Sequence, residues 1–179
     1  MKIFLTGMMG SGKSGHGQKL AKLLKFDFVD TDALIETSQR LTVSEIFERK
    51  GEDYFRQLEH ELLLDFSSPS NSVIATGGGF PCFGNNMDLM NSIGSTVYLK
   101  ADAAFLASRL QTQKSKRPLI AQLSGNDLVA YLKNLLQLRE SFYLKSKVVL
   151  ETKNLKTIQI VDRLVSNGLF IDNFELKKD

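Results

Sequence analysis

The sequence predicts an α/β fold in which helices cover both faces of a central parallel sheet. Short β-branched or aromatic runs alternate with helical patterns along the chain, an order typical of parallel sheets. A glycine-rich loop stands directly between the first such run and the first helical pattern. The 179 residues are 42% hydrophobic and 24% charged, which favours a folded globular chain over a disordered one. We therefore expect one domain that spans residues 1–179.

Four strand–helix pairs account for the alternation. They are Lys2–Thr6 with Lys13–Leu24, Ser72–Thr76 with Asn85–Asn91, Thr96–Lys100 with Ala103–Leu110, and Val148–Glu151 with Leu155–Ser166. Another short strand is expected within Phe26–Asp32. A long apolar stripe predicts a helix over Asp127–Lys145, with Asn126 or Asp127 as its N-cap.

Two stretches depart from the alternation. Residues 32–66 show helical patterns without a strand, and Thr42 with Glu45 fits a capping box. We expect a helical insert there that binds a phosphate acceptor. Residues 111–125 contain three basic residues and Pro118, and they look too polar for a core element. A loop of this length inside a compact domain is usually functional or disordered.

Composition excludes several classes of protein. No apolar run approaches the roughly 20 residues of a membrane span, and the N-terminal run continues into the glycine-rich loop without room for a signal peptide. Cys82 is the single cysteine, so no internal disulfide can form and a reducing, cytoplasmic location is expected. We expect its side chain to behave as a small buried hydrophobe.

Charge favours small anionic ligands over nucleic acid. Lys and Arg total 23 and Asp and Glu total 20, so the net charge is +3. The basic residues are scattered and do not alternate with aromatic residues, as they would in many nucleic-acid-binding surfaces. A mild positive charge suits a small anion whose field is focused locally.

The glycine-rich loop Gly7–Ser14 has the spacing G-x-x-x-x-G-K-S. In this setting glycines allow backbone N–H groups to surround phosphates, and the following helix adds its positive end. Lys13 is placed to reach the β- and γ-phosphates, and the Ser14 hydroxyl is placed to bind Mg²⁺. An exposed glycine-rich turn is a much weaker explanation.

The first turn of the following helix is unusual. Gly15 and Gly17 each cost a helix up to ~1 kcal/mol relative to alanine. Close backbone packing near a bound nucleotide would explain them, although they could also be tolerated weaknesses. His16 between them is expected to be a surface histidine.

Two carboxylates follow the strand predicted within Phe26–Asp32. Because alternate residues of an extended strand point the same way, Asp30 and Asp32 can both face the crevice at the carboxyl ends of the strands. One could hold Mg²⁺ while the other orients or deprotonates an attacking hydroxyl. The alternative is that Asp32 only caps a helix.

Further candidates are glycines and arginines. The run Gly77–Gly79 follows a predicted strand and suggests a backbone that approaches a ligand or another segment closely, although a flexible turn explains it about as well. Arg56, Arg117 and Arg139 could each bind a carboxylate or phosphate, but single arginines are most often solvated.

Taken together, these residues resemble the shikimate kinase family. The resemblance covers nearly the whole chain in order, and its specific parts are the following: Gly7–Ser14, Asp30-Thr31-Asp32, Phe55-Arg56-Gln57-Leu58-Glu59, Gly77-Gly78-Gly79, Arg117-Pro118-Leu119, and Arg139 followed by Tyr143. It implies a three-layer P-loop kinase fold with a helical acceptor-binding insert at about 32–66 and a mobile lid at about 111–125. The implied reaction converts shikimate and ATP to 3-phosphoshikimate and ADP.

The resemblance also implies a role for each matching residue. The residues implied to bind ATP are Gly10, Ser11, Gly12, Lys13, Ser14, Arg109 stacked on adenine, and Arg117, which would enter with the lid. Ser14 and Asp30 would hold Mg²⁺. The residues implied to bind shikimate are Asp32, Arg56, Gly78, Gly79 and Arg139. The loop at 152–156 would complete the adenine site, but its match is loose, and Gly15 stands where the family usually has Thr.

Two alternatives remain open at this point. A gluconate kinase or a nucleoside monophosphate kinase has a similar size and phosphate loop. A regulatory module that binds ATP without catalysis is the second alternative, although such a module has little reason to retain Lys13, Asp30, Asp32 and Arg117 together. We expect a monomer that binds neither nucleic acid nor membrane, because no sustained heptad or extra apolar face remains after the core is assigned.

Overall fold

The computed structural model describes residues 1–66, 70–111, 120 and 122–169. Its elements are β1 (Lys2–Thr6), α1 (Lys13–Leu24), β2 (Asp27–Asp30), α2 (Thr31–Gln39), α3 (Val43–Lys50), α4 (Glu52–Asp65), β3 (Ser72–Ala75), η1 (Phe80–Cys82), α5 (Asn86–Ile93), β4 (Ser95–Lys100), α6 (Ala103–Leu110), α8 (Gly125–Tyr143), β5 (Val148–Glu151) and α9 (Ile158–Ser166). Among these described elements, no helix has the length and apolar character of a membrane span.

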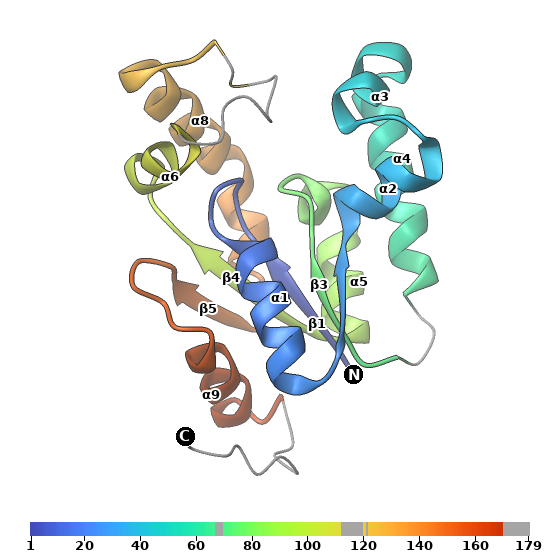
Figure 1. The fold of residues 1–179 in the computed structure, drawn as a ribbon, viewed down its shortest axis with the longest axis vertical. Coiled ribbons are helices and arrows are strands. Elements are labelled where there is room, and N and C mark those ends of the chain that lie inside the picture. The colour runs from blue at the N-terminus through green and yellow to red at the C-terminus, as the bar shows by residue number, and fades with distance from the viewer. Residues whose placement is uncertain (67–69, 112–119, 121, 170–179) are drawn as a thin grey trace.

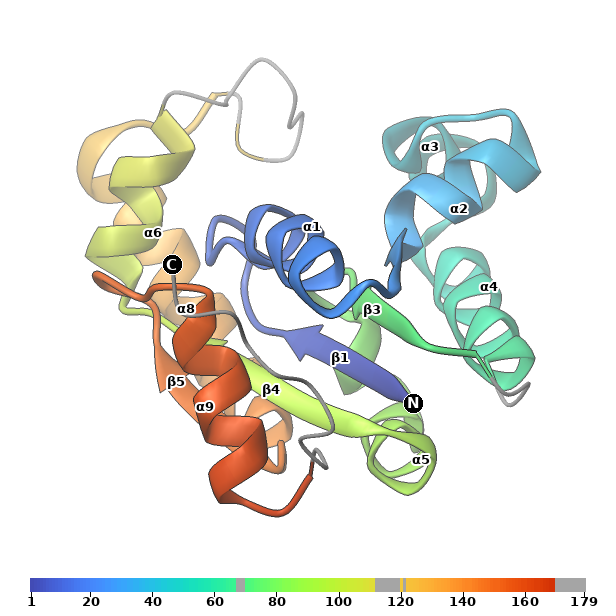
Figure 2. The same ribbon diagram turned by 60° about the horizontal axis from the view of Figure 1, so that its bottom comes forward.

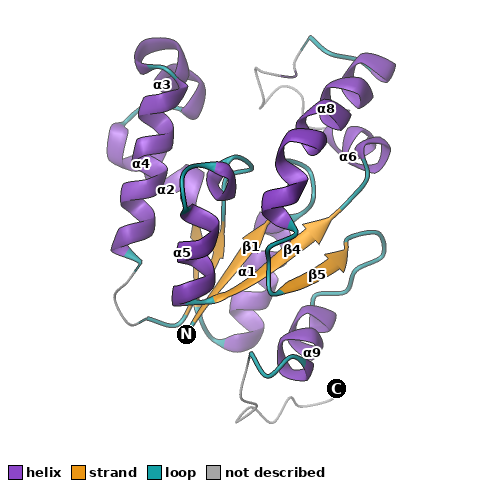
Figure 3. Cartoon of the chain, turned by 180° about the vertical axis from the view of Figure 1, so that it is seen from behind, coloured by secondary structure: helices purple, strands orange, loops and turns teal. Residues whose placement is uncertain are grey.

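The five strands form one parallel sheet in the order β2-β3-β1-β4-β5. Helices α1 and α9 cover one face, and α5 and α8 lie on the other (Figures 1 and 3). Successive side chains of β1 therefore pack on opposite faces of the sheet. Ile3 and Leu5 pack with α1 and α9, whereas Phe4 packs with α4 and α5. The predicted three-layer parallel arrangement is confirmed, and β1 is buried on both sides as a central strand requires.

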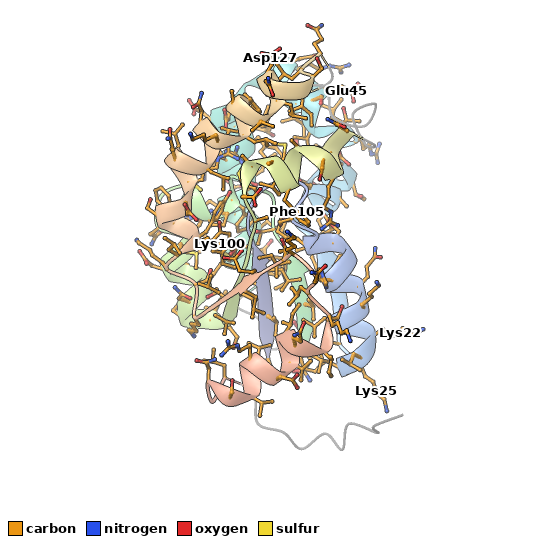
Figure 4. All side chains as sticks on the ribbon, turned by 90° about the vertical axis from the view of Figure 1, so that its left-hand side faces the viewer. Lys22, Lys25, Glu45, Lys100, Phe105 and Asp127 are labelled. Atoms are coloured by element: carbon orange, nitrogen blue, oxygen red, sulfur yellow. The ribbon has the colours of Figure 1, made fainter. Side chains whose placement is uncertain are left out.

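Two helical groups rise beyond the carboxyl ends of the strands. Figure 2 shows α2, α3 and α4 on one side of α1, and α6 with α8 on the other. The first group has its own small core of Ile35, Ile46 and Phe55. Thr42 and Glu45, the latter labelled in Figure 4, form the predicted capping box at the start of α3.

Several local predictions were wrong. Helix α8 begins at Gly125 after Ser124, and neither Asn126 nor Asp127 caps it. Helix α9 begins at Ile158, three residues later than expected. Ile120 is fully buried among residues of α6 and α8, so the segment 111–125 does contribute to the core. The rest of the predicted lid, 112–119 and 121 with Arg117, lies outside the described residues.

Candidate functional site

The glycine-rich loop connects β1 to α1 in a conformation that requires glycine. Gly7, Gly10 and Gly12 have φ values of 133°, 81° and 100°, which other residues rarely adopt. The Lys13 ammonium donates to the carbonyl oxygens of Gly7 at 2.7 Å and Met8 at 3.0 Å. The lysine therefore lies folded over its own loop, and residues 12–15 at the start of α1 line a cavity.

Ser14 and Asp30 meet at the edge of that loop. The Ser14 hydroxyl donates to Asp30 Oδ2 at 2.7 Å, and Asp30 Oδ1 caps α2 by accepting from the Ala33 N–H at 3.4 Å. The residue that caps the helix is thus Asp30, not Asp32. Strand β2 ends at Asp30 and Asp32 lies in the first turn of α2, so the strand-alternation argument for the pair was wrong.

Both carboxylates nevertheless reach the same cavity. This space, here called the P-loop cavity, has a volume of about 260 Å³. It is lined by Met9, Gly10, Gly12, Lys13, Ser14, Gly15, Asp30, Asp32, Thr76, Gly78 and Arg109. Arg109 comes from α6, where its guanidinium lies 5.6 Å from the ring of Phe105, a residue labelled in Figure 4. Helix α2 and the phosphate loop therefore bring hydroxyl, carboxylate and cationic groups together.

Arg56 of α4 is held by two acids on the same helix. Its Nη1 donates to Glu59 Oε2 at 2.6 Å and its Nη2 to Glu52 Oε1 at 2.6 Å. Glu59 is 0% exposed, and burial raises its pKa to about 7, with Arg56 offsetting part of the effect. The nearby Asp32 also raises the pKa of Glu59. No role was expected for Glu59 from the sequence, although its spacing of three residues from Arg56 on a helix permits an ion pair.

The triple glycine is explained by close approach. A Cβ added at Gly77 would lie 2.6 Å from both Asp32 Oδ1 and Glu59 Oε1, and one at Gly79 would overlap the Arg56 guanidinium. None of the three glycines requires a positive φ. The run therefore lets two carboxylates and a guanidinium contact the backbone, which decides against the flexible-turn explanation.

A second cavity is lined by the last glycine of this run. The arginine cavity, as we name it, has a volume of about 270 Å³ and is lined by Glu52, Asp53, Arg56, Gly79, Cys82, Phe83 and Arg139. Gly78 lines the first cavity and Gly79 the second. Cys82 is half-buried and lines this cavity, so it is less buried than expected. Burial raises the pKa of its thiol to about 11, which disfavours the reactive thiolate.

The structure explains only one of the two glycines at the start of α1, and it places His16 differently from the expectation. A Cβ at Gly17 would lie 2.6 Å from Phe28 Cε2, whereas one at Gly15 would meet nothing within 4 Å. Close packing thus explains Gly17, and it packs against β2 rather than near the phosphate loop's cavity. His16 is half-buried, contrary to expectation, and its Nδ1 lies 3.0 Å from Thr157 Oγ1. Burial, Arg109 and Lys19 lower the pKa of His16.

Comparison with known proteins identifies this arrangement. The family model described as shikimate kinase matches residues 9–167. The chain belongs to the shikimate kinase family. A shikimate kinase of Parabacteroides distasonis is 40% identical over 168 residues, which cover 94% of this chain and 96% of that protein.

Solved structures of shikimate kinases are similar along almost the whole chain. The crystal structure from Bacteroides thetaiotaomicron has 34% identity and a TM-score of 0.87, and covers 93% of this chain and 98% of that one. The Acinetobacter baumannii enzyme in complex with shikimate has 31% identity and a TM-score of 0.83, with 94% and 95% coverage. A gluconokinase from Sinorhizobium meliloti 1021 has 16% identity and a TM-score of 0.55, with 93% and 90% coverage, and shares the fold alone.

Proposed function

We propose that this chain transfers the γ-phosphate of ATP to the 3-hydroxyl of shikimate, giving 3-phosphoshikimate and ADP. The observation that carries the proposal is that consecutive residues, Gly78 and Gly79, line two different cavities. One is lined by a phosphate-binding loop and the other by two arginines. A triphosphate in the first and a small carboxylated alcohol in the second would place donor and acceptor side by side, in a chain that belongs to the shikimate kinase family.

In this proposal the backbone amides of Gly10–Lys13 bind the phosphates. Lys13 exchanges its two carbonyl contacts for the β- and γ-phosphate oxygens, which places a positive charge where negative charge develops. The β–γ bridging P–O bond breaks as the shikimate 3-hydroxyl oxygen bonds to phosphorus. Asp32 accepts the proton that leaves this hydroxyl, in line with its position in the P-loop cavity.

Arg56 and Arg139 would bind the shikimate carboxylate in the arginine cavity. Glu52 and Glu59 already orient the Arg56 guanidinium, so little side-chain freedom is lost on binding. Backbone groups of Gly78 and Gly79 would contact the acceptor. Arg109 would stack on adenine beside the loop at 152–156, and Arg117 would approach the transferring phosphoryl group and exclude water as a lid closes.

The donor set at Ser14 and Asp30 fits Mg²⁺. A hydroxyl and a carboxylate oxygen stand 2.7 Å apart, and Mg²⁺ is usually bound by one or two such protein ligands together with waters and phosphates. When bound, Mg²⁺ would neutralise charge on the β- and γ-phosphates. We expect the enzyme to act as a monomer in the cytoplasm.

A coupled assay of ADP release tests the proposal. Shikimate, gluconate and a nucleoside monophosphate are offered separately with MgATP, and we expect rapid ADP release with shikimate only. Phosphorylated shikimate is then identified by mass spectrometry. Release with another acceptor would transfer the proposal to that substrate, and tight ATP binding without any phosphorylated product would contradict it.

A further inference from the structure

Tyr143, the last residue of α8, touches both loops that bind substrates in the proposal above. Its side chain is 0% exposed. The hydroxyl donates to the Gly78 carbonyl oxygen at 2.5 Å and lies 3.4 Å from Met8 Sδ in the phosphate loop. Its ring packs against Tyr98 of β4 with centroids 5.0 Å apart. A buried hydroxyl with so short a contact to a glycine carbonyl restrains that peptide strongly.

The restraint reaches the cavity through the planarity of the peptide unit. The Gly78 carbonyl and the Gly79 N–H belong to one peptide, and in a trans peptide they point in opposite directions. Because Tyr143 holds the carbonyl, the Gly79 N–H points away from Tyr143, and the two glycines of this peptide line the two cavities. Within the described part of the chain, neither the Gly78 nor the Gly79 N–H donates to another protein group. These donors are therefore available to a ligand.

Glycine makes this restraint necessary. A peptide between two glycines can rotate at low cost because no Cβ limits the backbone on either side. Without a partner for the carbonyl, the Gly79 N–H would sample several orientations. Arg139 stands one helical turn before Tyr143, and its Nη1 lies 3.5 Å from the position of a Cβ at Gly78. Helix α8 thus carries both Arg139, which lines the arginine cavity, and Tyr143, which contacts the Gly78–Gly79 peptide.

We propose that Tyr143 is a positioning residue for the phosphate acceptor. Its hydroxyl fixes the Gly78–Gly79 peptide so that the Gly79 N–H donates to the acceptor next to Arg139. This role rests on the proposed function, because it needs an acceptor in the arginine cavity. Tyr143 does not touch the reacting atoms. Its contact with the Gly78 carbonyl is short at 2.5 Å, whereas its contact with Met8 of the phosphate loop is a weaker one to sulfur at 3.4 Å, so we expect its loss to lower acceptor affinity more than nucleotide affinity.

The test compares Tyr143→Phe with Tyr98→Phe. Each variant removes one hydroxyl from the same buried ring pair, but only Tyr143 contacts Gly78. We expect Tyr143→Phe to raise the shikimate KM by about three- to tenfold, the effect of one neutral hydrogen bond, with the ATP KM unchanged. Tyr98→Phe should leave both KM values unchanged. Equal effects in the two variants, parallel rises of both KM values, or an unaltered shikimate KM in Tyr143→Phe would overturn the proposal.

A measurement on the unaltered protein covers the case in which Tyr143→Phe does not fold. In a ¹⁵N-labelled sample, titration with shikimate should shift the Gly79 amide proton downfield while the amide of Gly84, which lines neither cavity, stays in place. A Gly79 amide that does not respond to bound shikimate would also overturn the proposal. If the unaltered enzyme neither binds nor phosphorylates shikimate, the proposed function itself has failed, and the two failures are thereby distinguished.

Discussion

Gly77→Ala should displace two carboxylates of the proposed shikimate site, those of Asp32 and Glu59. The new Cβ would lie 2.6 Å from Asp32 Oδ1 and 2.6 Å from Glu59 Oε1, whereas an ordinary contact begins at 3.4 Å. Each carboxylate must therefore move by roughly 0.8 Å, since the backbone follows β3 directly and Gly77 N–H is held by Thr31 Oγ1 at 2.9 Å. Glu59 cannot move alone because it is paired with Arg56.

The magnitude follows from these displacements. Overpacking of this kind costs about 1–3 kcal/mol of stability. A misplacement of about 1 Å in groups that position a substrate costs on the order of 10²-fold in rate. We therefore expect kcat/KM for shikimate to fall about 10²-fold while the dissociation constant of ATP, measured by calorimetry, stays within about threefold.

Gly17→Ala is the matched control. Its Cβ would overlap to the same degree, at 2.6 Å, but with the apolar Phe28 and away from both cavities. Urea unfolding should show a loss of stability in both variants. The loss should be smaller in Gly17→Ala by up to ~1 kcal/mol, because alanine favours the helix more than glycine does. Shikimate kinetics should change in Gly77→Ala alone. Normal shikimate kinetics in a destabilised Gly77→Ala would refute the idea that Asp32 and Glu59 position the acceptor.

Three further predictions address charge. Lys13→Ala and Arg117→Ala should each lower turnover in the ADP-release assay at least ~10²-fold, since both would lose charge stabilisation of the transferring phosphoryl group, and near-normal rates would remove these assignments. Arg56→Ala should mainly raise the shikimate KM, so an unchanged value would count against the carboxylate clamp. Glu59 has its folded-state pKa raised from 4.5 to about 7, so the folded protein holds an extra proton between these pH values and loses stability as pH rises through them. This shift in pKa corresponds to about 3 kcal/mol of free energy of unfolding. Urea unfolding should therefore show a lower stability at pH 7.5 than at pH 4.5 in the unaltered protein, and this difference should be smaller in Glu59→Gln. The same difference in both proteins would contradict a raised pKa at Glu59.

Patterns local in sequence predicted most of the fold. Helices α1 and α6 and strands β1 and β5 match the expected ranges because apolar periodicity and cap residues act over a few neighbours. The phosphate loop was equally predictable, since each glycine serves a backbone angle at its own position. Errors fell at helix starts such as those of α8 and α9, where several residues can serve as the first and packing decides.

The acceptor side of the site shows what such patterns leave open. Asp32 reaches the P-loop cavity from the first turn of a helix and not from the end of a strand, so its position was predicted correctly but for the wrong reason. Glu59 gains its raised pKa from burial, which depends on β3, α2 and α4 meeting at Gly77. No spacing in the sequence encodes that meeting.

The parallel α/β architecture, the phosphate loop and the family resemblance could all be inferred from the amino-acid sequence, because they depend on residue type and short spacing along the chain. The folded structure was needed to show which residues share a cavity, how Arg56 is held by Glu52 and Glu59, and that Tyr143 contacts the Gly78 carbonyl. Burial and contact between residues distant in sequence set those properties, and both arise only when the helices pack onto the sheet.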